Sequence, residues 1–104
     1  MNWQVYIILC TDSSLYTGIS VDAGRRFRQH ARRRGARFFW GRVPERLVYL
    51  ENGHDRSSAS RREAAIKKLQ RSDKLLLLAS SRNEIGAVSI SSEPAGDGMV
   101  ESTE

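Results

Sequence analysis

Residues 4–20 read Gln-Val-Tyr-Ile-Ile-Leu-Cys-Thr-Asp-Ser-Ser-Leu-Tyr-Thr-Gly-Ile-Ser, and this stretch decides the fold. Two runs rich in β-forming residues, 5–10 and 15–20, flank a Thr-Asp-Ser-Ser segment that has the composition of a turn. The stretch therefore predicts a β-hairpin, with Tyr6 on its first strand and Tyr16 on its second.

The length of the hairpin loop decides whether the two tyrosines share a face. With a simple four-residue loop, Cys10 would pair with Leu15, and Tyr6 and Tyr16 would point to opposite faces, because side chains alternate along a strand. A site that uses both tyrosines requires a loop of odd length or a bulge. We predict that irregularity.

The sequence pattern after the hairpin predicts three helices and one more strand. The expected elements are a helix over 22–33, a loop with aromatic residues over 35–42, a strand over 46–50, a helix from Ser57 or Ser58, and a short helix over 74–79. Asp22 can cap the first helix, and Asn52-Gly53 is expected to end the strand. The predicted fold class is α+β, a small three-stranded antiparallel sheet covered by helices in the order β-β-α-β-α-α.

The 104 residues of the chain are enough for a single domain. Charge is distributed unevenly along it. All 17 Lys and Arg lie in residues 1–82, which carry a net charge of +10, whereas residues 83–104 hold five acids and no base. The second part is rich in Ser and Gly and poor in bulky apolar residues, so we expect a folded domain over 1–82 and a disordered acidic tail over 83–104. A further hypothesis is that this tail folds back over the basic face as an electrostatic inhibitor.

The basic part predicts a polyanionic partner, with nucleic acid first, because Lys and Arg release counterions condensed on phosphates. The longest apolar runs, 5–10 and 75–79, are far shorter than the roughly 20 residues that span a bilayer. Residues 1–4 lack the basic side chain of an export signal. The single cysteine, Cys10, excludes an internal disulfide and is expected to fill the core. These features favour a cytoplasmic protein.

Three further residues have the chemistry that phosphodiester hydrolysis needs. Arg26 and His30 are four residues apart, hence on one face of the predicted helix and within reach of one phosphate. Glu63 lies on the apolar stripe of the second helix, where a carboxylate is costly unless it meets a cation or several donors. It could hold one Mg²⁺ whose other ligands are waters and the substrate phosphate. Tyrosine, with a pKa of about 10, is an awkward base, but a neighbouring guanidinium or metal ion favours its phenolate.

Simpler interpretations remain for some of these residues. Ser60 and Glu63 also fit a capping box, which would start the helix later and tie the carboxylate to the backbone. His54 reads as a loop residue. Gly18 lacks a Cβ atom and lets a phosphate or a side chain approach the strand closely.

The segments Gln4-Val5-Tyr6 and Tyr16-Thr17-Gly18, with 26–30 and Glu63, resemble the signature positions of the GIY-YIG nuclease superfamily. The resemblance spans about residues 3–79, and within the superfamily the chain looks like the small stand-alone YhbQ-like proteins. It implies a nuclease domain dependent on Mg²⁺ or Mn²⁺. The leading hypothesis is thus an endonuclease or a structure-selective nuclease that acts on DNA, for example in DNA repair, and RNA stays open as a substrate. By that analogy Tyr6 is the general base, and Tyr16 helps it at the water and the phosphate. Arg26 stabilises charge, His30 contacts the phosphate or the leaving group, and Glu63 is the metal ligand.

Other basic residues are expected to follow the nucleic-acid backbone. These are Arg25, Arg28, Arg32, Arg33 and Lys67. No base-reading helix or aromatic stacking platform is evident in the sequence, so a protein partner would supply targeting. An alternative function, binding without catalysis, is that of a nucleic-acid-binding module that retains the nuclease fold.

Overall fold

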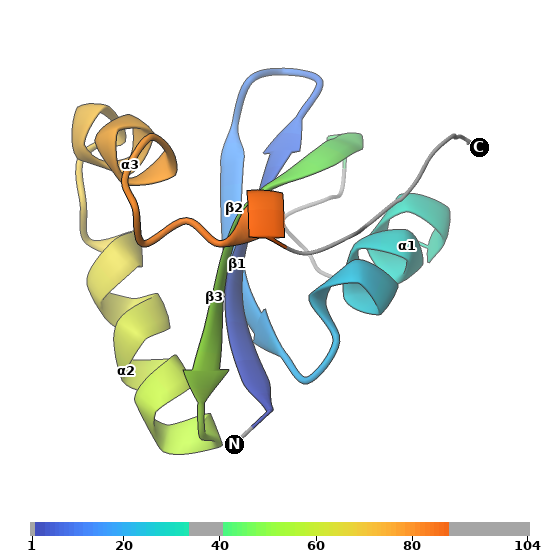
Figure 1. Cartoon of the computed structure of the whole chain (residues 1–104). Helices are drawn as coiled ribbons and strands as arrows, with labels where there is room; N and C mark the ends of the chain where they lie inside the picture. Colours follow the sequence, from blue (N-terminus) through green and yellow to red (C-terminus); the bar gives the residue numbers. More distant parts are fainter. Residues whose placement is uncertain (1, 34–40, 88–104) are drawn as a thin grey trace.

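A three-stranded antiparallel sheet lies between helices in the computed structural model, which describes residues 2–33 and 41–87 (Figure 1). The strands are β1 (Trp3–Cys10), β2 (Leu15–Ser20) and β3 (Pro44–His54), in the spatial order β2-β1-β3. The helices are α1 (Ala23–Arg33), α2 (Arg56–Lys67), α3 (Arg71–Leu78) and the 3-10 helix η2 (Ile85–Ala87). The predicted α+β class and the order β-β-α-β-α-α are confirmed.

The β1–β2 loop has the odd length that a shared tyrosine site requires. The amide of Cys10 donates to the carbonyl of Ser14 at 2.9 Å, and the amide of Ser13 donates to the carbonyl of Cys10 at 2.9 Å. The loop proper is therefore Thr11-Asp12-Ser13, and Ser13 takes a left-handed conformation with φ 71°. A three-residue hairpin loop that ends in a left-handed residue is a common way to join two strands.

This loop sets the register of the hairpin. Tyr6 pairs with Gly18 and Ile8 pairs with Tyr16. Tyr6 and Ile8 are two residues apart on β1, so both tyrosines point to the same face of the sheet. The predicted irregularity is confirmed.

Strand β3 is longer than the sequence indicated. It continues through Gly53 to His54, which pairs with Trp3 near the start of β1. Gly53 takes φ 81°, which glycine adopts without strain, and the register shifts between Trp3 and Val5. The expectation that Asn52-Gly53 ends the strand is therefore wrong, because pairing with β1 holds the chain extended beyond it.

The sheet has two buried faces, with α1 over one and α2 and α3 over the other (Figure 1). The α1 face buries Tyr6, Ile8, Cys10, Ala23 and Leu50. The α2 face buries Val5, Ile7, Tyr49, Ala59 and Ile66. Cys10 is buried in this core, as expected, and its burial raises the pKa of the thiol.

Helix α2 begins earlier than the alternative capping box would allow. Asp55 is its N-cap and accepts a hydrogen bond from the Ser58 amide at 2.7 Å, while the Ser58 hydroxyl accepts one from the Asp55 amide at 3.1 Å. The capping box considered for Ser60 and Glu63 is therefore wrong. The Glu63 side chain is left available for another role.

After α3 the chain returns to the outer edge of β3. The side-chain oxygen of Asn83 accepts hydrogen bonds from the amides of Leu50 at 3.2 Å and Ile85 at 3.0 Å. Its side-chain nitrogen donates to the carbonyls of Val48 and Leu78, both at 2.9 Å. One amide group thus joins β3, α3 and η2.

The fold consequently continues past the boundary expected at residue 82, as far as Ala87. The segments 34–40 and 88–104, which hold most of the expected aromatic loop and of the acidic tail, lie outside the described residues. Within the described ranges, no helix is long and apolar enough to cross a bilayer.

Candidate active site

Tyr6 of β1 and Tyr16 of β2 lie side by side on the α1 face of the sheet. Their ring centroids are 6.3 Å apart and the ring planes are inclined at 46°. Tyr6 has 1% of its surface exposed, whereas Tyr16 is partly buried. The pair therefore combines a buried phenol with a more accessible one.

Gly18 makes room for the Tyr6 ring on β2, which is an edge strand. A Cβ atom at this position would lie 2.6 Å from the Tyr6 hydroxyl oxygen and 3.1 Å from Cε2 of Tyr16. The first contact is too short for any side chain, so glycine is required for the Tyr6 hydroxyl to lie over β2. The close approach expected at Gly18 is made by the Tyr6 side chain.

Helix α1 carries the next two candidate residues. It begins after Asp22, whose Oδ1 accepts a hydrogen bond from the Arg25 amide at 3.0 Å, as expected for a cap. Arg26 and His30 are one turn apart and both act on Tyr6. The Arg26 guanidinium also donates to the side chain of Gln29 at 3.0 Å, which limits its freedom.

His30 is buried against the two tyrosines. Its Nε2 atom lies 3.4 Å from the Tyr6 hydroxyl oxygen, and its ring meets the Tyr16 ring edge-on with centroids 5.4 Å apart. None of the His30 surface is exposed. This position differs from the phosphate or leaving-group contact that the resemblance implied, because a fully covered ring cannot touch a bound phosphate directly.

The pKa values of these two buried groups are shifted in opposite directions. Burial raises the pKa of Tyr6 and the neighbouring Tyr16 raises it further, whereas the charge and hydrogen bond of Arg26 lower it by less. Burial and the Arg26 guanidinium lower the pKa of His30 to about 4. At neutral pH Tyr6 therefore keeps its proton and the His30 ring is uncharged. The effect of a guanidinium on the Tyr6 phenolate has the expected sign but is outweighed by burial.

Glu63 acts on the same site from α2. Its charge contributes to the raised pKa of Tyr6, which puts the carboxylate within electrostatic range of the Tyr6 hydroxyl. One carboxylate oxygen lies 3.1 Å from Nζ of Lys67, one turn further along α2, and 23% of the Glu63 side chain is exposed. The carboxylate is therefore partly desolvated, has a cation partner and remains accessible.

Binding of a metal ion at this site would rest on Glu63. Within residues 2–33 and 41–87, no three His, Cys, Asp or Glu side chains gather closely enough to hold a metal ion. The arrangement therefore does not fit an all-protein cage of the kind that Zn²⁺ or Ca²⁺ occupies. A single accessible carboxylate does fit Mg²⁺, which keeps several waters and takes further ligands from substrate phosphates.

Comparison with known proteins agrees with this geometry. Residues 2–76 match the sequence model of the GIY-YIG catalytic domain. The chain belongs to the GIY-YIG family. GIY-YIG domains are nuclease domains that generally depend on a metal ion, so membership implies a nuclease-like function on nucleic acid. The resemblance seen in the tyrosine motifs is confirmed.

Relatives of this GIY-YIG chain carry the name UPF0213. The UPF0213 protein DP2720 of Desulfotalea psychrophila is 44% identical over 87 residues, which cover 83% of this chain and 79% of the relative. The UPF0213 protein HQ_3675A of Haloquadratum walsbyi is 46% identical over 70 residues, or 67% of this chain and 79% of the relative. The solution NMR structure of the UPF0213 protein BH0048 from Bacillus halodurans matches with a TM-score of 0.51 and 39% identity, over 79% of this chain and 87% of that one.

The basic side chains expected to contact nucleic acid lie on two sides of the GIY-YIG domain. Arg25, Arg28 and Arg32 are exposed on α1 at spacings of three and four residues, so they form one stripe. Arg33 is the last residue of α1, and Lys67 is exposed on α2. The structure thus brings Arg25, Arg28 and Arg32 together and sets Lys67 on the other side of the sheet.

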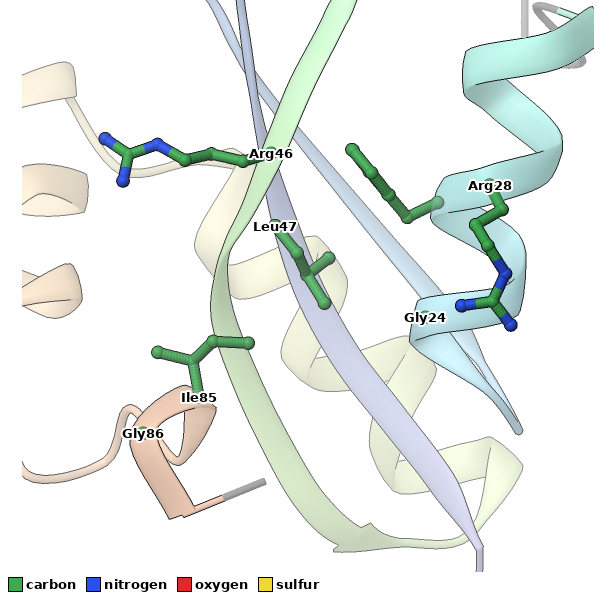
Figure 2. Close-up of a pocket in the computed structure, with 7 residues that line it drawn as sticks. Gly24, Arg28, Arg46, Leu47, Ile85 and Gly86 are labelled. Carbon is green, nitrogen blue, oxygen red and sulfur yellow. The ribbon is translucent and has the colours of Figure 1, made fainter. Parts of the chain in front are cut away.

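A hollow of about 390 Å³ lies between α1, β3 and η2 of the GIY-YIG domain (Figure 2). Leu47 and Ile85 form apolar walls, and the Arg46 side chain extends away from α1. None of the candidate catalytic residues lines this hollow. It is therefore separate from the candidate active site.

Sequence reasoning missed a second polar cluster in this GIY-YIG domain, on the α2 face. Glu51 of β3 is 4% exposed and is contacted by Tyr49, His54, Arg62 and Arg82. A signal was present, because an acid two residues after Tyr49 interrupts an apolar strand. The interpretation of His54 as a loop residue is wrong, since it ends β3 inside this cluster.

Proposed function

We propose that this GIY-YIG domain hydrolyses phosphodiester bonds in DNA with the help of Mg²⁺ or Mn²⁺ bound at Glu63. The observation that carries the proposal is the environment of the Tyr6 hydroxyl. It lies over Gly18 on an edge strand, 3.4 Å from the uncharged ring of His30. Arg26 and Glu63 both act on it electrostatically. The Tyr6 hydroxyl thus has a proton acceptor beside it, and its pKa responds to a cation on α1 and to the proposed metal ligand on α2.

Tyr6 and His30 form a proton path in this proposal. The oxygen of an attacking water forms a bond to phosphorus while its proton passes to the Tyr6 oxygen, and the Tyr6 hydroxyl proton passes to Nε2 of His30. The bond from phosphorus to the leaving oxygen breaks, and its electron pair goes to that oxygen, which takes a proton from solvent. His30, whose pKa is lowered to about 4, then returns its proton to solvent. This path lets Tyr6 act as a general base although its own pKa is raised.

The other site residues supply charge and orientation. The guanidinium of Arg26 can donate two parallel hydrogen bonds to phosphate oxygens and stabilise the charge that develops on them. A divalent ion at Glu63, when bound, would neutralise phosphate charge and stabilise the leaving oxygen. Tyr16, the more accessible phenol, is assigned to positioning the water and the phosphate.

The substrate would bind mainly through its backbone. The exposed stripe of Arg25, Arg28 and Arg32 on α1 offers contacts to phosphates, which position a nucleic acid without reading its sequence. We propose DNA as the first substrate and RNA as the second, in the cytoplasm, with a protein partner that supplies selectivity.

Cleavage assays on nicked, branched and single-stranded DNA, and on matching RNA, test this function with Mg²⁺ or with EDTA. We expect cleavage by the wild-type protein with Mg²⁺ and a loss of at least about 100-fold in Glu63→Gln. The matched control is Glu45→Gln, which removes the same charge from an exposed position of β3 and should keep full activity. Cleavage that survives Glu63→Gln would contradict the site. Tight, salt-sensitive binding without cleavage of any substrate would instead support the non-catalytic binding module.

A further inference from the structure

Helix α2 is attached to the sheet by few apolar side chains. Ala59 and Ile66 are its fully buried residues, and the small side chain of an alanine makes too few packing contacts to resist rotation of the helix about its axis. The capping box of Asp55 and Ser58 fixes where the helix begins, but not how far it is turned about its axis. At its start, α2 is also held by the contact of Nδ1 of His54 with the Ser58 hydroxyl at 2.9 Å and by the Arg56 guanidinium over the Trp3 ring, so a contact further along would set the rotation of its second half.

An ion pair between α2 and β3 provides this contact; Glu51 is buried, and 25% of the Arg62 side chain is exposed. Nε of Arg62 donates to both carboxylate oxygens of Glu51, at 2.9 and 3.2 Å. The Glu51 carboxylate also accepts a hydrogen bond from the Tyr49 hydroxyl and lies 2.8 Å from Nε2 of His54. Nε of Arg82 adds a second guanidinium at 3.5 Å. Burial alone would raise the pKa of Glu51, but the hydrogen bonds from these neighbours hold it below its usual value, so the pair is charged at neutral pH.

The angular positions on α2 connect this ion pair to Glu63. Successive residues of a helix are about 100° apart, so Arg62 falls about 60° to one side of Ala59 and Glu63 about 40° to the other. Ala59 faces the sheet, in which β3 and β2 flank β1. Arg62 reaches β3 on one flank of the helix. Glu63 is thereby carried to the opposite flank, from which it acts on Tyr6.

We propose that Glu51 and Arg62 are positioning residues, because their ion pair sets the rotation of α2 and so aims the Glu63 carboxylate at the Tyr6 site. This inference rests on the proposed role of Glu63 as metal ligand. At the outer radius of a helix, about 5–6 Å, a rotation of about 20° moves a side chain by about 2 Å. A displacement of about 1 Å is enough to cost about 100-fold in rate.

Variants of both partners separate a positioning role from simple stabilisation. Glu51→Gln keeps the shape of the side chain and removes its charge. The double variant Glu51→Met with Arg62→Met removes both charges, and apolar replacement of a buried pair commonly restores stability. If the pair only stabilised the fold, the double variant would recover activity together with its Tm. If the pair orients α2, activity stays low in a stable protein.

The rotation of α2 can be measured without any catalysis. Residual dipolar couplings of the α2 amides, recorded on metal-free protein, give the orientation and phase of the helix relative to the sheet. We expect Glu51→Gln and the double variant to shift this phase. We also expect Mn²⁺ affinity, measured by electron paramagnetic resonance of free Mn²⁺, and kcat to fall by about 10–100-fold, with little change in KM for DNA.

The matched control is Arg61→Met. It removes the same charge from the neighbouring exposed residue, whose Nη1 donates to the Ser57 hydroxyl at 2.6 Å, and should leave the couplings, Mn²⁺ affinity and kcat unchanged. The conservative variant Arg62→Lys should recover part of each.

Two outcomes would overturn the inference. One is unchanged dipolar couplings in Glu51→Gln and in the double variant, and the other is full wild-type kcat in the double variant. A wild-type protein that cleaves no nucleic acid would instead defeat the proposed function. In that case the couplings alone would still decide whether the ion pair orients α2.

Discussion

Tyr6 and Tyr49 occupy buried polar clusters on opposite faces of one sheet, and their partners differ in charge. Tyr6 meets the uncharged ring of His30 over an edge strand. Tyr49 donates to the carboxylate of Glu51, whose charge is matched by Arg62. Burial and the bond to Glu51 raise the pKa of Tyr49 to about 12.

The comparison teaches what makes a buried tyrosine available for proton transfer. A phenol bonded to a charge-compensated carboxylate is locked as a donor, because giving up its proton would place a second negative charge beside the first. Burial raises the pKa of Tyr6 as well, but the uncharged histidine beside it offers an acceptor for its proton. Under the proposed function, the same residue type is structural on one face of the sheet and takes part in proton transfer on the other.

Removal of each hydroxyl in turn would break the comparison most directly. Tyr6→Phe should lower single-turnover cleavage by about 10²–10⁴-fold, the usual contribution of a general base. Tyr49→Phe should instead lower the free energy of unfolding by about 1–3 kcal/mol, because Glu51 loses a donor in a buried place. Urea unfolding and cleavage rates per folded molecule measure the two effects. Equal losses of cleavage in both variants would abolish the distinction between the two tyrosines.

A methyl group at Gly18 would displace the Tyr6 ring while leaving its hydroxyl group in place on the ring, so it tests the position of the hydroxyl separately from its chemistry. Gly18→Ala places a Cβ atom 2.6 Å from the Tyr6 hydroxyl oxygen, so the ring has to shift. We expect cleavage to fall by about 100-fold and stability by about 1–3 kcal/mol. Gly86→Ala is the matched control, since a Cβ atom there meets nothing within 4 Å, and it should change stability by less than about 0.5 kcal/mol. If Gly18→Ala cleaved DNA at the wild-type rate, the Tyr6 hydroxyl would not need to lie over β2.

A third expected effect is on the pH dependence of stability. The pKa of His30 is lowered to about 4 in the folded protein, against about 6.5 in the unfolded chain. Its contribution to stability is therefore complete above pH 6.5 and is lost as the pH falls from 6.5 towards 4, because the unfolded chain binds the proton first.

An NMR titration of the His30 ring, with urea unfolding at several pH values, measures this shift. His30→Gln should flatten the stability profile between pH 6.5 and 5. A midpoint near 6.5 for the folded protein would contradict the burial of the ring and the predicted loss of stability between pH 6.5 and 4.

Local sequence signals predicted the hairpin and the start of α1. The alternation around Tyr6 and Tyr16, together with the need for a shared face, indicated the odd loop that Ser13 closes. Asp22 acts as the expected cap of α1. Each of these features depends on residues close together in the chain, which is why single-sequence reasoning reached them.

Features that depend on distant residues could not be predicted in this way. Asn52-Gly53 is ordinarily a turn signal, but pairing of His54 with Trp3 keeps the strand extended. The donors to Glu51 come from β3, α2 and the segment after α3, so only the folded chain reveals the cluster. The burial of His30 likewise depends on how α1 packs on the tyrosines.

The hydrogen bonds that Asn83 makes to β3 also bear on self-association. β3 is an edge strand, and unpaired amides on such an edge are templates onto which another chain can add a strand. The Asn83 side chain bonds Leu50 and Val48, and the backbone amide of Glu84 donates to the carbonyl of Leu50 at 2.7 Å. A chain ending at Arg82 would leave this edge of β3 exposed and should aggregate, whereas a chain ending at Ala87 would keep the edge covered. A truncation that tests the acidic tail should therefore cut after Ala87.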